Sequence, residues 1–94
     1  NDTIIFYCDN ARHLVCIPYS IPNLHRMAEE LNIKRSWYHG GMRPHYDIPK
    51  KRIKEIQAKC NIVSSREILL ITQGKKFNNL LTLEFLFVDY YGYI

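Results

Sequence analysis

Two short stretches of the sequence gather the side chains that could carry out chemistry. The first runs from Asp9 to His13 and includes Arg12, and the second is RPHYD, residues 43–47. Histidine and aspartate can transfer protons or bind a metal ion, and arginine donates a fork of N–H groups to phosphate or carboxylate. The residue types therefore indicate acid–base, metal or phosphate-binding chemistry at two places along the chain.

The RPHYD segment would present its polar side chains in a defined way if it is extended. Successive side chains of a strand point to opposite faces, so His45 and Asp47 would share one face and Tyr46 would lie on the other. Arg43, two positions before His45, would lie on the same face as His45. An alternative is that Asp47 caps the helix that follows, a role that leaves His45 available for chemistry.

Asp9 follows the apolar run TIIFYC, which is typical of a buried strand. In open α/β sheets ligands bind just beyond the carboxyl ends of the strands, where Asp9, Arg12 and His13 would lie. A carboxylate at this point could bind a metal ion. An aspartate is also a common way to start a turn, and the sequence alone favours the turn.

Two further side chains have both a functional and an ordinary explanation. His25 lies near the edge of the buried face of an expected helix, where a histidine most often bonds a nearby carbonyl group. Trp37 follows two cations in KRSW and could stack on a nucleobase, although a lone tryptophan is more often a core anchor. The cations between residues 50 and 59 favour a solvated helix face rather than a nucleic-acid stripe.

The elements that must position these residues alternate between strands and helices. We expect strands over residues 3–8, 13–17, 33–38 and 61–63, and helices between Ser20 and Asn32, over 49–60 with Pro49 as the first helical position, and over 66–73. Ser64 and Glu67 have the spacing of a capping box, and Gly74 is suited to end the last helix.

The expected fold class is α/β, a single small domain in which a short mixed sheet is covered by two or three helices. The domain would span residues 1–76. The aromatic tail, residues 77–94, favours a strand, although its apolar spacing also fits a helix. We expect the tail to complete the domain or to form an interface, and therefore expect a homo-oligomer, because an apolar strand edge needs a partner.

Composition limits the class of protein. Ninety-four residues suit one domain, and a net charge of +4 is compatible with a phosphate-bearing partner. Three cysteines without a CxxC pair argue against a zinc ribbon or a thioredoxin-like motif. We expect no signal peptide and no membrane association, and so a cytoplasmic protein, in the host cytoplasm if a phage encodes it.

Six segments occur in an order that resembles a family of bacterial and bacteriophage proteins, the domain-of-unknown-function family 4031. They are FYCD, RHLV, LH, KRSW, PHYDIP and SSREIL, and together they cover about residues 4 to 72. One departure is CIPYS, where family members commonly have an Asp-Thr pair. The resemblance implies no established activity, but it leans towards nucleotide or nucleic-acid chemistry. It also implies that the recurring polar groups share one pocket with two walls, Asp9–His13 and RPHYD.

Three functions fit that pocket. The first is binding of a phosphorylated ligand, a nucleotide or a nucleic-acid end, by Asp9, Arg12, His25, Arg35, Trp37, Arg43 and Tyr46. The second is a small phosphodiesterase or nuclease, with His13 and His45 as acid and base, or with Asp9, Asp47 and histidines holding a divalent metal. The third is a structural or protein-interaction module. We expect the first, because the pocket is rich in donors and short of carboxylates.

Overall fold

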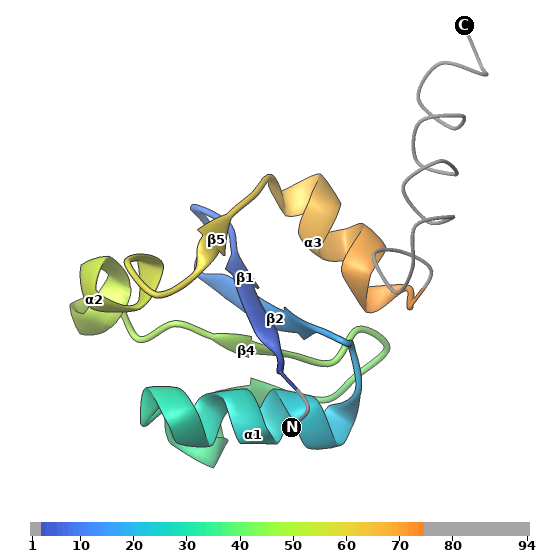
Figure 1. The fold of residues 1–94 in the computed structure, drawn as a ribbon, viewed down its shortest axis with the longest axis horizontal. Coiled ribbons are helices and arrows are strands. Elements are labelled where there is room, and N and C mark those ends of the chain that lie inside the picture. Colours follow the sequence, from blue (N-terminus) through green and yellow to red (C-terminus); the bar gives the residue numbers. More distant parts are fainter. Residues whose placement is uncertain (1–2, 75–94) are drawn as a thin grey trace, which may run out of the picture.

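The computed structural model describes residues 3–74, which form a mixed five-stranded sheet with helices on both faces (Figure 1). The strand order is β3-β4-β2-β1-β5. The strands are β1 (Ile5–Cys8), β2 (His13–Ile17), β3 (Tyr38–His39), β4 (His45–Asp47) and β5 (Asn61–Ile62). β5 runs parallel to β1 and the other neighbours are antiparallel, so the expected α/β fold with a short mixed sheet is confirmed.

Helix α1 (Ile21–Leu31) covers one face of the sheet. The Ser20 hydroxyl accepts the N–H of Asn23 and caps its start, and Asn32 ends it in the left-handed conformation, with φ of 56°. Its inward face is apolar at helical spacing, because the buried residues are Leu24, Met27, Ala28 and Leu31. The expected boundaries of this helix are confirmed.

Helix α3 (Ser65–Thr72) covers the opposite face. The capping box between Ser64 and Glu67 is present in both directions, as the sequence predicts. Ile68, Ile71 and Thr72 are buried against the sheet. The helix begins directly after β5, so its first residue lies at the carboxyl end of that strand.

Two predicted elements are wrong in type or length. Residues 33–38 are not a strand: Arg35–Trp37 form a 3₁₀ turn (η1), and only Tyr38–His39 pair with the sheet. Residues 49–60 are not one helix, because Lys50–Arg52 form a 3₁₀ turn (η2) before the short helix α2 (Ile53–Gln57), and Pro49 is the N-cap of η2 rather than a first helical position. Arg52 explains the break, since its guanidinium donates to the carbonyl groups of Leu31 and Asn32 and ties this segment to the end of α1.

The sheet register sorts the side chains between the two faces. Leu14 faces Tyr46 across β2 and β4, and both are fully buried on the α1 side. Cys16 is buried on the same side, and burial raises the pKa of its thiol to about 12. The expected tail, residues 77–94, and the oligomer interface assigned to it lie outside the described residues. Within residues 3–74, no helix combines the length and apolar character that crossing a bilayer requires.

Candidate functional site

Four polar side chains from three neighbouring strands share the α3 face of the sheet. His13 on β2 is the register partner of Asp47 on β4, and His45 on β4 is the partner of His39 on β3. Directly opposed residues of antiparallel strands point to the same face, with Cβ atoms about 4.5–5.5 Å apart. The register alone therefore gathers three imidazoles and a carboxylate. Their rings are close: the centroid of His45 lies 5.4 Å from that of His13 and 5.2 Å from that of His39.

Asp9 lies at the end of β1 and is 1% exposed, the most deeply buried carboxylate among the described residues. Its Oδ1 accepts the main-chain N–H groups of Ala11 and His13, each at 2.9 Å, and so forms the turn that the sequence favours. Its Oδ2 accepts the Ser65 hydroxyl at 2.6 Å and contacts Nδ1 of His13 at 2.8 Å. Burial opposes ionisation, but the hydrogen bonds from Ser65 and His13 outweigh it and lower the pKa of Asp9 below its ordinary value.

The Asp9 contact defines the protonation of His13. An ionised carboxylate only accepts hydrogen bonds, so Nδ1 of His13 carries the proton. In the neutral imidazole the other ring nitrogen, Nε2, then carries no proton and has a lone pair that can bind a metal ion. The His13 side chain is 41% exposed, so a solvated ion can reach it.

His45 is oriented in the same way by a different acceptor. Its Nδ1 contacts the Arg43 carbonyl oxygen at 2.7 Å, so this nitrogen also carries the proton. Nε2 of His45 then faces Oδ1 of Asp47 at 3.4 Å. A lone pair and a carboxylate oxygen repel each other at this distance unless a proton or a metal cation lies between them. The geometry of His45 and Asp47 therefore fits either a protonated imidazole paired with the carboxylate or a metal cation held between the two atoms.

His13, His45 and Asp47 lie close enough together to hold a metal ion. Each offers one ligand atom, and these atoms all lie within 4.8 Å of one another. A tetrahedral zinc ion with ligands at 2.0–2.1 Å would place them about 3.3 Å apart, close to the 3.4 Å between His45 and Asp47. Metal-bound histidines nearly always donate their second N–H group to a carboxylate or carbonyl, as His13 and His45 do here.

His39 completes the surroundings of Asp47. Its Nε2 lies 2.8 Å from Oδ2 of Asp47, the oxygen that does not face His45. Asp47 makes no capping hydrogen bond to the turn η2 that follows, so the alternative role expected for it is wrong. Its side chain instead lies between two histidines of the polar face, with Oδ2 at hydrogen-bond distance from His39 and Oδ1 facing His45 at 3.4 Å.

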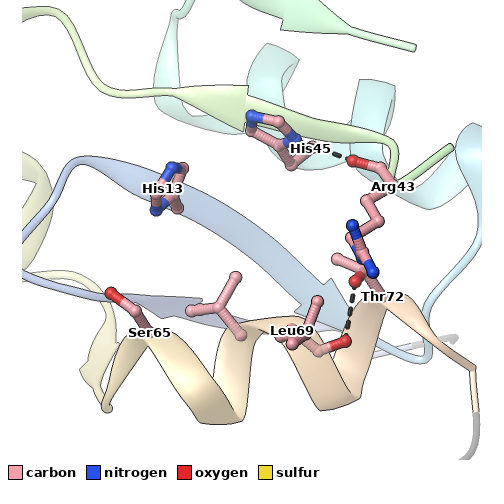
Figure 2. A pocket seen from close by; sticks show the side chains of 7 residues that line it. His13, Arg43, His45, Ser65, Leu69 and Thr72 are labelled. Atoms are coloured by element: carbon pink, nitrogen blue, oxygen red, sulfur yellow. Dashed lines mark hydrogen bonds between the residues drawn. The ribbon is translucent and has the colours of Figure 1, made fainter. Parts of the chain in front are cut away.

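A cavity of about 150 Å³ borders this centre between the sheet and α3. It is lined by His13, Arg43, His45, Ser65, Ile68, Leu69 and Thr72. Figure 2 shows the two histidines on the sheet side and the Arg43 side chain extending from the β3–β4 connection towards α3. Cavities that hold organic ligands are usually 300–1,000 Å³, so this one has room for an ion, water and a small group.

The other predicted site residues do not share this cavity. His25 and Tyr46 lie on the α1 face, where Nδ1 of His25 meets the Tyr46 hydroxyl at 2.7 Å. Burial raises the pKa of Tyr46, and a hydrogen bond from the Arg35 side chain opposes that rise. The partner of His25 is thus a hydroxyl rather than the carbonyl expected. Because Tyr46 is fully buried beneath α1, these three residues form a structural network on the other face of the sheet from His13, His45 and Asp47.

Arg12 and Trp37 belong to a third place. They line a separate cavity together with Pro49, Lys50 and Lys51. Trp37 also packs against the core, so part of its ring has the ordinary role that the sequence favours. The single pocket expected from the sequence is therefore wrong: its residues divide among a metal-type centre, a buried network and a cationic cavity.

Two residues of the site were not predicted. Only the β3–β4 pairing brings His39 to Asp47. The length of the loop between the two strands sets this pairing, and no sequence motif indicates it. Ser65 follows the capping residue Ser64, and its place at the carboxyl end of β5 is the signal that could have indicated it.

Comparison with protein families gives one match, to a model described as a protein of unknown function, DUF4031, over residues 9–75. The match covers most of the chain. The chain belongs to the DUF4031 family. The resemblance expected from the sequence is thus confirmed, and the DUF4031 segment contains both Asp9 and Ser65 and every histidine and aspartate of the polar face. No curated protein and no solved structure matches the chain.

Proposed function

We propose that this protein is a small metal-dependent hydrolase of phosphate esters, with His13, His45 and Asp47 as the metal ligands. The observation that carries the proposal is the facing pair of His45 Nε2 and Asp47 Oδ1, 3.4 Å apart, with Nδ1 of His45 already committed to a carbonyl oxygen. His13 supplies a third ligand atom within 4.8 Å. Two imidazoles and one carboxylate are a usual ligand set of catalytic zinc, which keeps a further position for water.

A metal ion at this position would generate the nucleophile. Zinc lowers the pKa of bound water to about 7, so a hydroxide is present at neutral pH. Hydrolysis would form one P–O bond to this hydroxide and break the ester P–O bond, and the leaving oxygen would take up a proton from water. Asp9 does not bind the metal in this scheme, because both of its oxygens are already engaged; it holds His13 in place.

Arg43 supplies a positive charge that would bind the phosphate group of the substrate. It is the one cation among the described residues that line the cavity, and its side chain reaches along that cavity towards α3 (Figure 2). A guanidinium can bind two phosphate oxygens at once, and it stabilises the negative charge that develops on them during attack. Ile68 and Leu69, which also line the cavity beside Ser65 and Thr72, are apolar and would limit the access of water to the reacting group.

This proposal reverses the order of functions expected from the sequence. The sequence favours ligand binding without catalysis because the pocket is short of carboxylates. A metal centre with two histidine ligands, however, needs only one carboxylate. Arg12 and Arg35, two of the three arginines expected to contact phosphate, do not line this cavity. Phosphate recognition without hydrolysis remains the alternative, and turnover separates the two.

The test uses the full chain, stripped of metal with EDTA and titrated by calorimetry with Zn²⁺, Co²⁺, Mn²⁺ and Mg²⁺. We expect one transition-metal ion per chain and metal-dependent hydrolysis of bis(p-nitrophenyl) phosphate. His13→Ala, His45→Ala and Asp47→Asn should each weaken metal binding by more than the roughly 10–100-fold that loss of an outer partner costs.

His25→Gln is the matched control, because His25 lies on the opposite face of the sheet and should leave metal affinity and turnover unchanged. Failure to bind any of the four ions would overturn the metal centre. Tight binding without turnover of any phosphate ester would retain the centre but reject the hydrolase. Turnover that persists in EDTA would point to acid–base catalysis by the histidines instead.

A further inference from the structure

A second cavity is lined by Arg12, Trp37, Pro49, Lys50 and Lys51. Its volume is about 430 Å³, within the range of cavities that hold an organic ligand. The first cavity, at about 150 Å³, is below that range. Of the two, the second cavity is therefore the one with room for an organic ligand.

The charged side chains that line this cavity are all positive. Three of its five described lining residues are cations, and none carries a carboxylate. Lys50 and Lys51 form no ion pair among those found within residues 3–74, whereas Lys59 on the same segment is paired with Glu55. Unneutralised cations around a concave surface focus positive potential and attract anions.

Arg12 is held in place by the strand end beside it. Its φ of 72° is in the left-handed region, which residues with a Cβ atom rarely adopt. Two contacts with Ile48 secure it: the Arg12 carbonyl accepts the Ile48 N–H at 2.8 Å, and Nη1 donates to the Ile48 carbonyl at 3.0 Å. The guanidinium is thus oriented without a carboxylate, and its remaining N–H groups stay available for an anion.

Trp37 adds an aromatic surface to these cations. It is half-buried, packs against the core and lines the cavity, so the ring is rigid and yet accessible. Aromatic rings stack on nucleobases, and cations beside them bind the backbone phosphates, which is how proteins bind single-stranded nucleic acid. The combination of an indole with three cations favours a ligand that has both a base and a phosphate.

The two sites are joined through the β2–β4 pair. His13 and Asp47 are register partners, and the next residue along each strand end, Arg12 and Ile48, forms the bonded pair described above. Lys50 follows Ile48 by two residues. Residues of the two sites are therefore adjacent in sequence at both strand ends.

We infer that the Arg12–Trp37 cavity binds a nucleoside phosphate, with the base stacked on Trp37 and the phosphate on Arg12, Lys50 and Lys51. This makes nucleotides or single-stranded nucleic acid the substrate class of the hydrolase. The catalytic part of the inference rests on the proposed function, but the binding itself requires no metal.

Tryptophan fluorescence reports on this cavity alone, because Trp37 is the only tryptophan in the chain. The full chain in EDTA is titrated with adenosine monophosphate, with a short oligothymidylate and with inorganic phosphate. We expect saturable quenching by the first or the second and none by phosphate, since quenching requires a stacked base. Equal affinity per site for the mononucleotide and the oligonucleotide identifies a free nucleotide site, and much tighter oligonucleotide binding identifies a strand-binding site.

Variants connect the signal to the residues. Lys50→Ala with Lys51→Ala should weaken binding roughly tenfold or more and reduce its salt dependence. The matched control, Lys54→Ala with Lys59→Ala, removes the same charge from the same segment outside the cavity and should have a much smaller effect. Trp37→Leu, followed by anisotropy of a labelled oligonucleotide, should weaken binding about 5- to 150-fold, the range measured for loss of one stacked base.

The inference is overturned if neither the mononucleotide nor the oligonucleotide gives saturable quenching. It is also overturned if the two double-lysine variants lose the same amount of binding affinity. Because EDTA removes the metal, this failure would still leave hydrolysis of small phosphate esters standing. Conversely, a protein that quenches as expected but hydrolyses nothing would keep the binding site and reject the hydrolase.

Discussion

The Asp9 carboxylate holds His13 at two points, through the main-chain N–H at 2.9 Å and through ring Nδ1 at 2.8 Å. One buried side chain thereby sets both the path of the turn between β1 and β2 and the orientation of the first proposed ligand. The same carboxylate accepts the Ser65 hydroxyl at the start of α3. The metal-type centre is thus tied to both a strand end and a helix start.

Asp9→Asn tests this relationship. The amide that replaces the carboxylate presents an N–H group on one side, so it cannot accept from Ser65, Nδ1 of His13 and the main chain together. We expect metal affinity to fall about 10–100-fold, measured by competition with a chelator. Ser65→Ala removes only one of these bonds and should have a smaller effect. Unchanged affinity in Asp9→Asn, with the fold retained by circular dichroism, would contradict the role assigned to Asp9.

His39→Ala tests the partner of Asp47. The His39 side chain is 55% exposed, so its loss should hardly change the free energy of unfolding. Asp47 would lose the contact at Oδ2, and we expect metal affinity to fall roughly tenfold. A loss as large as that of His45→Ala would show that His39 is itself a ligand. No loss at all would mean that the His39–Asp47 contact is an ordinary surface pair.

The alternation of side chains along β4 could be predicted from the sequence, and so could the caps of α1 and α3. These features depend on a few neighbouring residues. The same alternation places Tyr46 away from His45, and it would have removed Tyr46 and its partner His25 from the predicted pocket. Arg35 was misplaced because a 3₁₀ turn replaced the predicted strand, and tertiary contacts decided that outcome rather than local propensity.

The contacts of His39 and Ser65 could not be predicted in this way. His39 meets Asp47 because β3 pairs with β4 in one particular register, and a shift by one residue would turn it to the other face. Ser65 meets Asp9 across 56 residues of sequence, through the parallel pairing of β1 with β5. Both contacts depend on long-range pairing. The place of Ser65 at the carboxyl end of β5 indicates that it could join a site but not that it meets Asp9, and no local signal indicates His39.

Ser64→Ala tests how far the position of α3 depends on its cap. The substitution removes the half of the capping box in which the Ser64 hydroxyl accepts the Glu67 N–H, and it leaves the main-chain N–H of residue 64 to donate to the Glu67 side chain. We expect the free energy of unfolding to fall by about 1 kcal/mol, measured by urea denaturation. Arg66→Ala, an exposed change on the same turn, should cost much less. Equal effects of the two variants would contradict the role of the cap.

The pH dependence of stability should carry a contribution from His25. Burial, together with the nearby Arg35 charge, lowers the pKa of His25 below its ordinary value of 6.5. The folded protein therefore resists protonation of a group that the unfolded chain protonates near pH 6.5, so this contribution is present above that pH and is lost as the pH falls below it. His25→Gln removes the group, so the stability advantage of the native chain over the variant should shrink between pH 7.5 and about pH 5. The measurement is urea unfolding of both chains in EDTA at each pH, and the difference between the two free energies of unfolding is compared across the pH range. A difference that stays constant or grows as the pH falls would show that protonation of His25 does not oppose folding.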